Sequence, residues 1–271
     1  MSDLLDQMVA SSRQRADRLT ADRLERLAEM AQRAADPIDI MSSSRRFDVI
    51  AEAKLRSPVS GRLAPAGDDI QTVVSLARAY EAGGAAAISI LTEPSRFDGE
   101  LSHLKAVADA VSVPVMRKDF LVDPAQLVES RAHGASGVLL IARMLGPRLI
   151  TRMIEQAREM GMFALIELFG PEDLDTVGSA QGSADLLGIN SRDLSDLSVR
   201  SDRLEAMASV LPAEVPWVAE SGLTSPADVA EVSRLGYRYA LVGTGLATSA
   251  DPRSDLRDMI AAGRATTEGA S

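Results

Sequence analysis

Cysteine is absent from this chain. Its absence excludes disulfide bonds, thiolate catalysis and metal sites built from cysteine. Histidine is scarce, and both copies, His103 and His133, fall in segments with a helical pattern rather than at strand ends. We therefore expect these two side chains to pack between helices or to lie at the surface, and we expect no metal site.

Long apolar runs and an excess of positive charge are also missing. No run approaches the roughly 20 apolar residues of a membrane span, and the first residues lack the basic start and apolar core of a signal peptide. The formal net charge of −10 at pH 7 argues against nucleic acid as a partner. We expect a cytoplasmic protein that binds neither membrane nor nucleic acid. Its 46% apolar residues are enough for one sizeable core.

Lysine is rare, and its placement is informative. Of the 29 Lys and Arg residues, only Lys54, Lys105 and Lys118 are lysines. Lys105 falls on a helical segment, whereas Lys54 and Lys118 follow apolar runs where a strand passes into a polar loop. A guanidinium stays protonated, but an ammonium can be desolvated and lose its proton. Lys54 and Lys118 are therefore the first candidates for acid, base or nucleophilic chemistry.

Eight short apolar runs alternate with helical segments along the chain. Continuous apolar strands are typical of a parallel sheet that helices cover on both faces. Proline in the first turn, after Asp or Ser as a cap, marks helix starts at Asp123-Pro124, Ser225-Pro226 and Asp251-Pro252. The predicted strands are 47–53, 85–91, 113–116, 137–142, 163–167, 186–190, 215–219 and 240–242, and the predicted helices include 70–82, 124–133, 147–160, 171–180 and 226–235.

Eight strand–helix units in this length predict a single (β/α)8 barrel. A doubly wound open sheet is the competing fold, but the even spacing and the lack of an early Gly-x-Gly-x-x-Gly turn count against it. Residues 1–46 are expected to form a helical extension, either a lid or floor for the barrel or a solvated flank. The barrel is expected over 47–264, and a flexible tail over 265–271.

The carboxyl ends of the strands converge on one face of such a barrel, so polar residues there become neighbours. Amines among carboxylates can act as acid and base, because burial and like charge lower the pKa of one amine while a nearby carboxylate keeps another protonated. Any one of these residues alone would also suit a structural ion pair. The residues at the strand ends are Glu52, Lys54, Lys118, Glu167, Asn190, Arg192, Glu220 and Ser221.

Glycines follow the last two strands, with Gly222 after the seventh and Gly243-Thr244-Gly245 after the eighth. Loops at these two positions form the usual phosphate site of such barrels, through backbone N–H groups and a short helix N-terminus. Tight turns would explain either loop alone, but the two together predict phosphate. Phe97 and Phe120 also follow strand ends and suit a flat aromatic substrate, although core packing would explain each.

Five segments, in the same order along nearly the whole chain, resemble the indole-3-glycerol-phosphate synthase family of tryptophan biosynthesis. They are IAEAKLRSP at 50–58, SILTEP at 89–94 with Phe97 and Gly99, PVMRKDF at 114–120, GINSRDL at 188–194 and AESG at 219–222. The resemblance implies ring closure of 1-(2-carboxyphenylamino)-1-deoxyribulose 5-phosphate with loss of CO2 and water, without a metal or an organic cofactor.

The resemblance also implies roles for the strand-end residues. Lys118 would be the general acid that protonates the substrate ketone as the ring carbon attacks it. Lys54 and Glu52 would assist proton transfer and dehydration, and Glu167 would stabilise the cationic intermediate or take a proton. Of the others, Asn190 and Ser221 would orient the substrate, Arg192 would pair with its carboxylate, Phe97 and Phe120 would pack on its ring, Ser57, Gly222, Gly243 and Thr244 would hold its phosphate, and Glu220 would contact it.

Departures from the family pattern leave alternatives open. Val59 and Ser60 stand where the family usually has Ser and Lys, and Leu168-Phe169 follow Glu167 where a small residue and then His or Asn is common. The alternatives are a paralogue acting on a substituted anthranilate, a Schiff-base lyase in which Lys118 attacks a sugar-phosphate carbonyl, and a non-catalytic paralogue that binds phosphorylated metabolites or a pathway enzyme. We expect a monomer, and other enzymes of the pathway stay open as partners.

Overall fold

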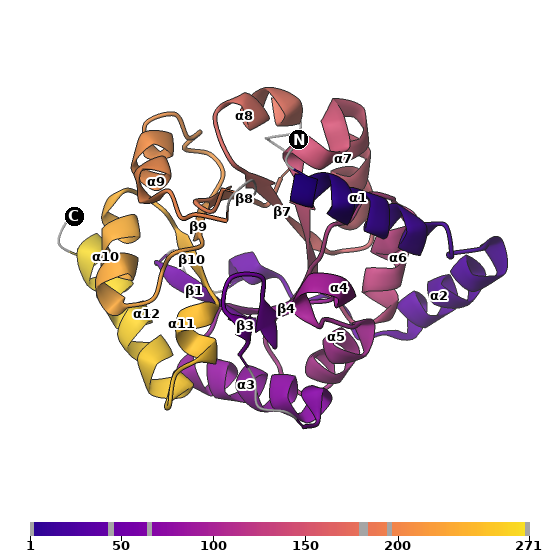
Figure 1. The fold of residues 1–271 in the computed structure, drawn as a ribbon, viewed down its shortest axis with the longest axis horizontal. Coiled ribbons are helices and arrows are strands. Elements are labelled where there is room, and N and C mark those ends of the chain that lie inside the picture. Colours follow the sequence, from indigo (N-terminus) through magenta and orange to yellow (C-terminus); the bar gives the residue numbers. More distant parts are fainter. Residues whose placement is uncertain (1–2, 43–45, 64–66, 179–183, 194–196, 269–271) are drawn as a thin grey trace.

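A computed structural model of the chain describes residues 3–42, 46–63, 67–178, 184–193 and 197–268. Eight parallel strands close into a barrel in the order β1-β10-β9-β8-β7-β6-β5-β4, and helices surround it (Figure 1). The predicted (β/α)8 fold is confirmed. The strands are β1 (Asp48–Ala53), β4 (Ala87–Leu91), β5 (Val115–Lys118), β6 (Gly137–Ile141), β7 (Phe163–Leu168), β8 (Leu186–Asn190), β9 (Trp217–Glu220) and β10 (Tyr239–Val242).

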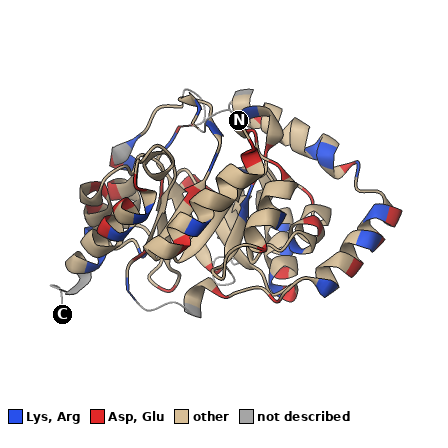
Figure 2. Cartoon of the chain, turned by 90° about the horizontal axis from the view of Figure 1, so that it is seen from below, with Lys and Arg blue, Asp and Glu red and all other residues tan. Residues whose placement is uncertain are grey.

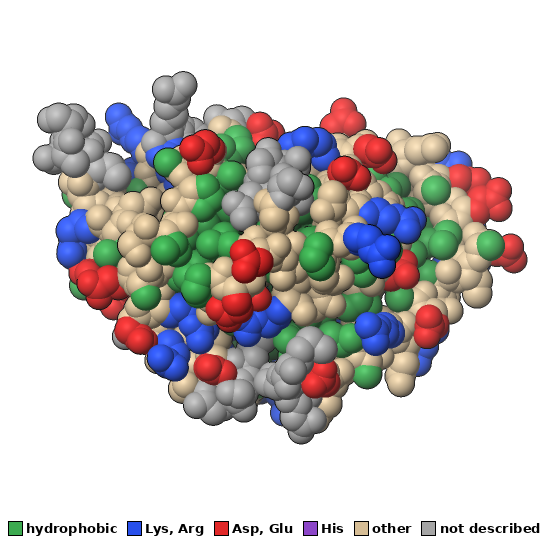
Figure 3. Space-filling model, turned by 90° about the horizontal axis from the view of Figure 1, so that it is seen from above, with side chains coloured by type: hydrophobic (Ala, Val, Ile, Leu, Met, Phe, Trp, Pro, Cys, Tyr) green, Lys and Arg blue, Asp and Glu red, His purple; other side chains and the backbone are tan. Residues whose placement is uncertain are grey.

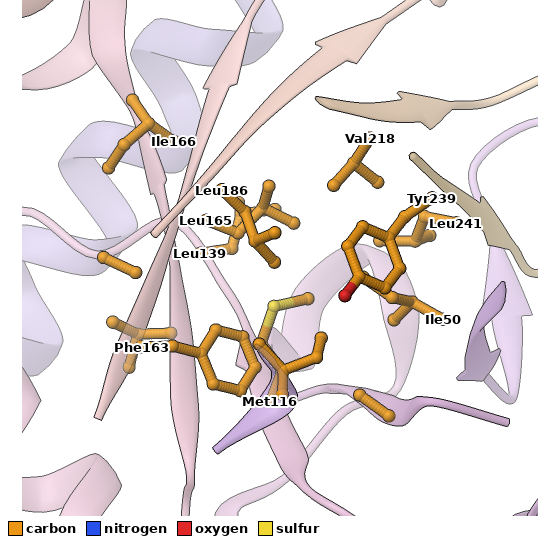
Figure 4. Packing of buried hydrophobic residues seen from close by; sticks show 14 of the residues in the cluster. Ile50, Met116, Leu139, Phe163, Leu165, Ile166, Leu186, Val218, Tyr239 and Leu241 are labelled. Atoms are coloured by element: carbon orange, nitrogen blue, oxygen red, sulfur yellow. The ribbon is translucent and has the colours of Figure 1, made fainter. Parts of the chain in front are cut away.

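Side chains alternate between the barrel interior and the surrounding helices, as they must along a strand. Ile50, Leu165 and Tyr239 point toward one another inside the barrel, whereas Ile166 points away from them (Figure 4). All four side chains are buried, so residues on both faces of the sheet are covered. Because both faces are covered, the strands are continuous apolar runs, and this is why the sequence reveals them so clearly.

The helices follow the strands in the expected alternation, and two of the three predicted caps are present. Ser225 forms a capping box with Asp228, and Asp251 accepts from the Ser254 N–H at 3.1 Å. The N-cap of α6 is Pro124 rather than Asp123, although the Asp123 carboxylate accepts from the Ala125 N–H at 2.8 Å. The helices after β1 are α3 (Asp69–Gly83), α4 (Pro94–Phe97), α5 (Leu101–Ala108), α6 (Ala125–Ala132), α7 (Ala142–Glu159), α8 (Glu172–Val177), α9 (Ser201–Ala208), α10 (Pro226–Arg234), α11 (Thr244–Ala247) and α12 (Pro252–Glu268).

Several boundaries differ from the prediction. α7 starts at Ala142, and Gly146 with φ 69° interrupts it, so the predicted start at 147 matches its second segment. α8 ends at Val177, and the predicted end at 180 lies outside the described residues. α4, α9 and a short hairpin of β2 (Arg56–Ser57) and β3 (Gly61–Arg62) were not predicted, because elements this short carry too few residues for a periodic pattern.

The predicted placement of His103, His133 and Lys105 in helical segments is confirmed, with His133 as the C-cap of α6. His103 is buried on α5, while Lys105 is half exposed on the same helix and paired with Asp109. The His133 ring lies at the end of α6, with its Nδ1 2.7 Å from the carbonyl oxygen of Glu129.

The N-terminal extension contains α1 (Asp3–Ala16) and α2 (Ala21–Arg33). α1 crosses the rim of the barrel, and α2 projects to one side (Figure 1). Leu27 of α2 and Leu19, just before this helix, pack with Ala132 of α6. The outer surface of α2 carries both signs of charge (Figure 2). Among the described residues, no helix is long and apolar enough to cross a membrane.

The last helix extends into the segment that was expected as a flexible tail from residue 265, because α12 continues to Glu268. Thr266 Oγ1 lies 2.6 Å from Ser233 Oγ of α10 and 2.7 Å from the Gly263 carbonyl oxygen within α12. The contact with Ser233 joins the last turns of α12 to α10.

Candidate active site

The sequence-predicted site residues all line one cavity of about 320 Å³ at the carboxyl ends of the strands. They converge because the strand register places inward-facing residues from neighbouring strands at the same height: Ile141 pairs with Glu167, and Asn190 pairs with Glu220. The predicted residues that line the cavity are Glu52, Lys54, Ser57, Phe97, Lys118, Phe120, Glu167, Asn190, Arg192, Glu220, Ser221, Gly222, Gly243 and Thr244.

Lys118, at the end of β5, lies between two carboxylates. Its Nζ is 2.9 Å from Glu167 Oε2 and 3.2 Å from Glu220 Oε2. Burial alone would lower the pKa of Lys118, but the charges of Glu167, Glu220 and Glu52 outweigh it and raise that pKa above its ordinary value. Lys118 is therefore the amine that carboxylates keep protonated, and it is not the amine of lowered pKa that the sequence also predicted.

The surroundings of Glu220 raise the pKa of its carboxyl group. Burial raises its pKa, the charge of Lys118 lowers it, and the neighbouring Glu167 raises it again, with a result of about 8. Its side chain has room because Gly188 on β8 lacks a Cβ, which would otherwise lie 2.1 Å from Glu220 Oε1. Lys118, Glu167 and Glu220 are hereafter called the Lys118 cluster.

A second lysine–carboxylate pair lies at the carboxyl end of β1. Lys54 Nζ is 2.9 Å from Glu52 Oε1, and we call these two residues the Lys54 pair. Burial would raise the pKa of Glu52, but the charges of Lys54 and Lys118 lower it below its ordinary value. A Cβ on Gly243 would lie 2.3 Å from Glu52 Oε1 and 2.8 Å from Lys54 Nζ, so the loop after β10 needs glycine for this close approach.

Asn190 connects the Lys118 cluster to the loop after β9. Its Nδ2 donates to Glu167 Oε1 at 3.2 Å. Its Oδ1 accepts from the Ser221 hydroxyl at 2.8 Å and from the Arg192 N–H at 2.9 Å. Ser221 has a φ of 69°, a strained conformation for a residue with a Cβ. In this conformation the Ser221 hydroxyl bonds to Asn190, and both side chains line the cavity.

The remaining predicted residues complete the wall of the cavity. The rings of Phe97 and Phe120 lie 6.3 Å apart between centroids, close enough to form one aromatic wall. The Arg192 guanidinium donates to the Leu197 carbonyl at 2.7 Å. The Ser57 hydroxyl accepts from the Val59 N–H at 3.3 Å, while Gly222 lies in the loop after β9, and Gly243 and Thr244 follow β10.

Sequence reasoning missed several residues that line the cavity. Leu4 and Met8 of α1 contribute to its wall, so the extension lies over the mouth as a lid rather than as a floor. Asp119, between Lys118 and Phe120, also lines the cavity. A helical stripe at 4, 8, 12 and 15 was the available signal for α1.

Apolar, acidic and basic side chains are intermixed on the outer face of the molecule (Figure 3).

The fold and the cavity define a barrel enzyme whose charged side chains meet at the carboxyl ends of the strands. The family model for indole-3-glycerol phosphate synthase matches residues 4–259. The chain belongs to the indole-3-glycerol phosphate synthase family, the decarboxylating lyases of tryptophan biosynthesis.

Relatives with the same name support this membership. The indole-3-glycerol phosphate synthase of Mycolicibacterium vanbaalenii is 44% identical over 250 residues, which cover 92% of this chain and 90% of that protein. The Mycolicibacterium smegmatis protein is 42% identical over 242 residues, covering 89% of this chain and 87% of its own. The match therefore spans the whole barrel and is not limited to one motif.

Solved structures show the same fold in more distant proteins. 3-Hexulose-6-phosphate synthase from Salmonella typhimurium has a TM-score of 0.66 at 16% identity, covering 81% of this chain and 100% of that one. Thiamine phosphate pyrophosphorylase from Pyrococcus furiosus has a TM-score of 0.59 at 18% identity, with 81% and 96% covered. At these identities the likeness concerns the barrel alone.

Proposed function

We propose that this cavity closes the indole ring of 1-(2-carboxyphenylamino)-1-deoxyribulose 5-phosphate and releases CO2 and water. Family membership supports the reaction, and the Lys118 cluster supports the assignment of its acid. A buried ammonium between two carboxylates is a proton donor aimed into a cavity that admits a small molecule. This cluster is the observation on which the assignment of residues rests.

Lys118 acts in the first step. The ring carbon that bears the carboxylate attacks the substrate ketone, and Lys118 gives a proton to the ketone oxygen as the new C–C bond forms. The ring is then cationic, and Glu167 stabilises this charge. Loss of CO2 returns the electrons of the C–COO⁻ bond to the ring. Lys118 regains its proton in a later step, with Glu167 and Glu220 beside it as proton-bearing groups.

The Lys54 pair serves the dehydration. The hydroxyl formed from the ketone leaves as water after it gains a proton, and the adjacent CH₂ group loses a proton to complete the indole. Lys54 is a suitable acid for the hydroxyl and Glu52 a suitable base for the carbon, because they lie side by side at the mouth. Asn190 and Ser221 orient the substrate between the Lys118 cluster and the Lys54 pair.

The substrate spans the cavity between its two ends. Phe97 and Phe120 stack against the anthranilate ring, and Arg192 faces the carboxylate that is later lost as CO2. Ser57, Gly222, Gly243 and Thr244 hold the phosphate through hydroxyl and backbone N–H groups, as barrel loops after the last two strands do in general. Glu220 contacts the substrate through its neutral carboxyl group.

The Schiff-base alternative needs a neutral amine as nucleophile. The position of Lys118 between Glu167 and Glu220 favours the ammonium form, and so it favours acid catalysis over imine formation. Borohydride treatment in the presence of substrate distinguishes the two, because only an imine would be trapped as a covalent adduct. We also propose that the protein is cytoplasmic and that it is a monomer. Sedimentation of the purified protein can test the monomeric state.

The direct test is turnover of the purified protein with the carboxyphenylamino-deoxyribulose phosphate, followed by the fluorescence of the indole product. We expect product to accumulate without added metal or organic cofactor. Absence of turnover, with the substrate still bound, would favour a non-catalytic paralogue. Turnover only with a ring-substituted substrate would favour a paralogue of altered specificity.

A further inference from the structure

α1 is bound to the residue that follows Lys118. Arg15 donates from Nη1 to Asp119 Oδ2 at 2.7 Å and from Nη2 to Asp119 Oδ1 at 2.8 Å. The Asp119 side chain is completely buried, and that of Arg15 is 22% exposed. The N-terminal helix thus makes a bidentate, charge-assisted bond, the strong kind, at the end of β5.

The Asp119 carboxylate also fixes the backbone around Lys118. Its Oδ1 accepts from the Phe120 N–H at 2.7 Å, and its Oδ2 accepts from the Thr92 hydroxyl at 2.7 Å. Burial would raise the pKa of Asp119, but Arg15 and Arg117 outweigh it and hold that pKa well below its usual range. A charged carboxylate therefore holds the turn between Lys118 and Phe120, two residues that line the cavity.

A buried network continues from Asp119 into α6. The side chain of Arg117 is 1% exposed. Its Nη2 lies 3.0 Å from Asp119 Oδ2, and its Nη1 lies 3.1 Å from Glu129 Oε2. Glu129 Oε1 also lies 3.7 Å from Arg23 Nη2, whereas the arginines that contact Asp119 are Arg15 and Arg117. Removing Arg15 takes one of these two cations from a completely buried carboxylate, so the side chains around Asp119 must rearrange.

One face of α1 serves both the cavity and this network. Leu4, Met8, Ser12 and Arg15 follow one another at helical spacing. Leu4 and Met8 line the cavity, and the Ser12 hydroxyl accepts from Gln126 Nε2 at 3.0 Å. The half of the face nearer the N-terminus therefore lines the cavity, while the other half is bonded to Gln126 of α6 and to Asp119, the residue after Lys118.

We propose that Arg15 and Asp119 are positioning residues for ring closure, through which α1 holds Lys118 and Phe120 in place against the substrate. The proposal rests on the proposed role of Lys118 as the acid. A misplacement of about 1 Å can cost roughly 10²-fold in rate. The proposed phosphate loops follow other strands, β9 and β10, so the effect falls on kcat more than on KM.

Arg15→Gln is the test variant, and Arg264→Gln is its matched control. Arg264 donates to the buried Asp48 at the amino end of β1, so both variants take an arginine from a buried aspartate, one at each end of the barrel. We expect Arg15→Gln to lower kcat per folded molecule by roughly 10- to 100-fold with KM changed by less than about threefold. Arg264→Gln should lower the thermal midpoint while leaving kcat and KM unchanged.

Two further variants separate positioning from general destabilisation. Arg15→Lys should restore part of kcat, since it keeps the charge but not the fork. In the double variant Arg15→Gln/Asp119→Asn, the loss should not exceed that of the more affected single variant, because both changes break one bond. Wild-type kcat in Arg15→Gln, or an equal loss in Arg264→Gln, would overturn the proposal. A wild-type protein without turnover would instead overturn the proposed function.

Discussion

Lys118 and Lys54 face the same cavity but have different surroundings. Lys118 lies between Glu167 and Glu220, while the ion pair of Lys54 is with Glu52, against the loop of Gly243. The same residue type therefore occurs in two different settings within one cavity. In the proposed reaction, the Lys118 cluster supplies the proton for the ketone, and the Lys54 pair serves the dehydration beside the proposed phosphate loop.

The largest effect should come from Lys118→Arg. The variant keeps a positive charge beside Glu167 and Glu220, but a guanidinium does not give up its proton. We expect kcat to fall on the order of 10²- to 10⁴-fold, with calorimetric binding of a reduced substrate analogue retained. Lys105→Arg is the control, because Lys105 lies on α5 with a half-exposed side chain. It should have wild-type kcat. Near wild-type turnover of Lys118→Arg would exclude Lys118 as the acid.

Substitution of Gly243 tests the other end of the cavity. Gly243→Asp adds a carboxylate to the proposed phosphate loop and a Cβ 2.3 Å from Glu52 Oε1. We expect KM to rise by roughly tenfold or more, and competitive inhibition by inorganic phosphate to weaken. Gly67→Ala is the control, because a Cβ there meets no heavy atom within 4 Å. Equal phosphate binding by wild type and Gly243→Asp in calorimetry would remove phosphate from this loop.

The pH dependence tests the Lys118 cluster more gently. With the pKa of Glu220 at about 8 against an ordinary 4.5, the folded protein holds a proton that the unfolded chain releases. The stabilisation is complete below about pH 4.5 and is lost as the pH rises toward about 8. Ionised Glu220 also binds the Lys118 proton more tightly, so kcat should fall above this pKa.

Glu220→Gln should remove both effects. We would measure the free energy of unfolding in urea at pH 5 and at pH 8.5. The decrease between these two pH values should be smaller for Glu220→Gln than for wild type. The kcat of Glu220→Gln should lose the basic limb near pH 8. If wild type and Glu220→Gln change in parallel over this range, Glu220 is ionised at neutral pH and the cluster holds no spare proton.

The sequence alone predicted the barrel fold and the residues that line the cavity. Buried parallel strands are continuous apolar runs, and a residue such as Glu167 or Asn190 at the end of such a run must face the common mouth. The order of strands then follows from the fold. This is why residues as distant as Glu52 and Ser221 could be assigned to one pocket before any contact was known.

The pairing inside the cavity could not be predicted in this way. Whether Lys118 meets Glu52, Glu167 or Glu220 depends on strand stagger and on the space left by Gly188, which are tertiary properties. The docking of α1 was also beyond the sequence, because an amphipathic helix has an apolar face whatever it packs against. Asp119 was overlooked for the same reason, since its partner Arg15 lies 104 residues away.

The smallest expected effect concerns Arg192, and it tests which aromatic acid the cavity accepts. A carboxylate that leaves as CO2 has to be held before ring closure, so a guanidinium at its edge should favour the substrate over a ligand without that group. Arg192→Leu should weaken a reduced substrate analogue by roughly tenfold more than its descarboxy counterpart, measured as dissociation constants for both proteins. Arg192→Lys controls for the lost bond to the Leu197 carbonyl, since it keeps the charge without the fork. Equal losses for the two ligands would make Arg192 a support of its own loop, and the carboxylate would then need another partner in the cavity.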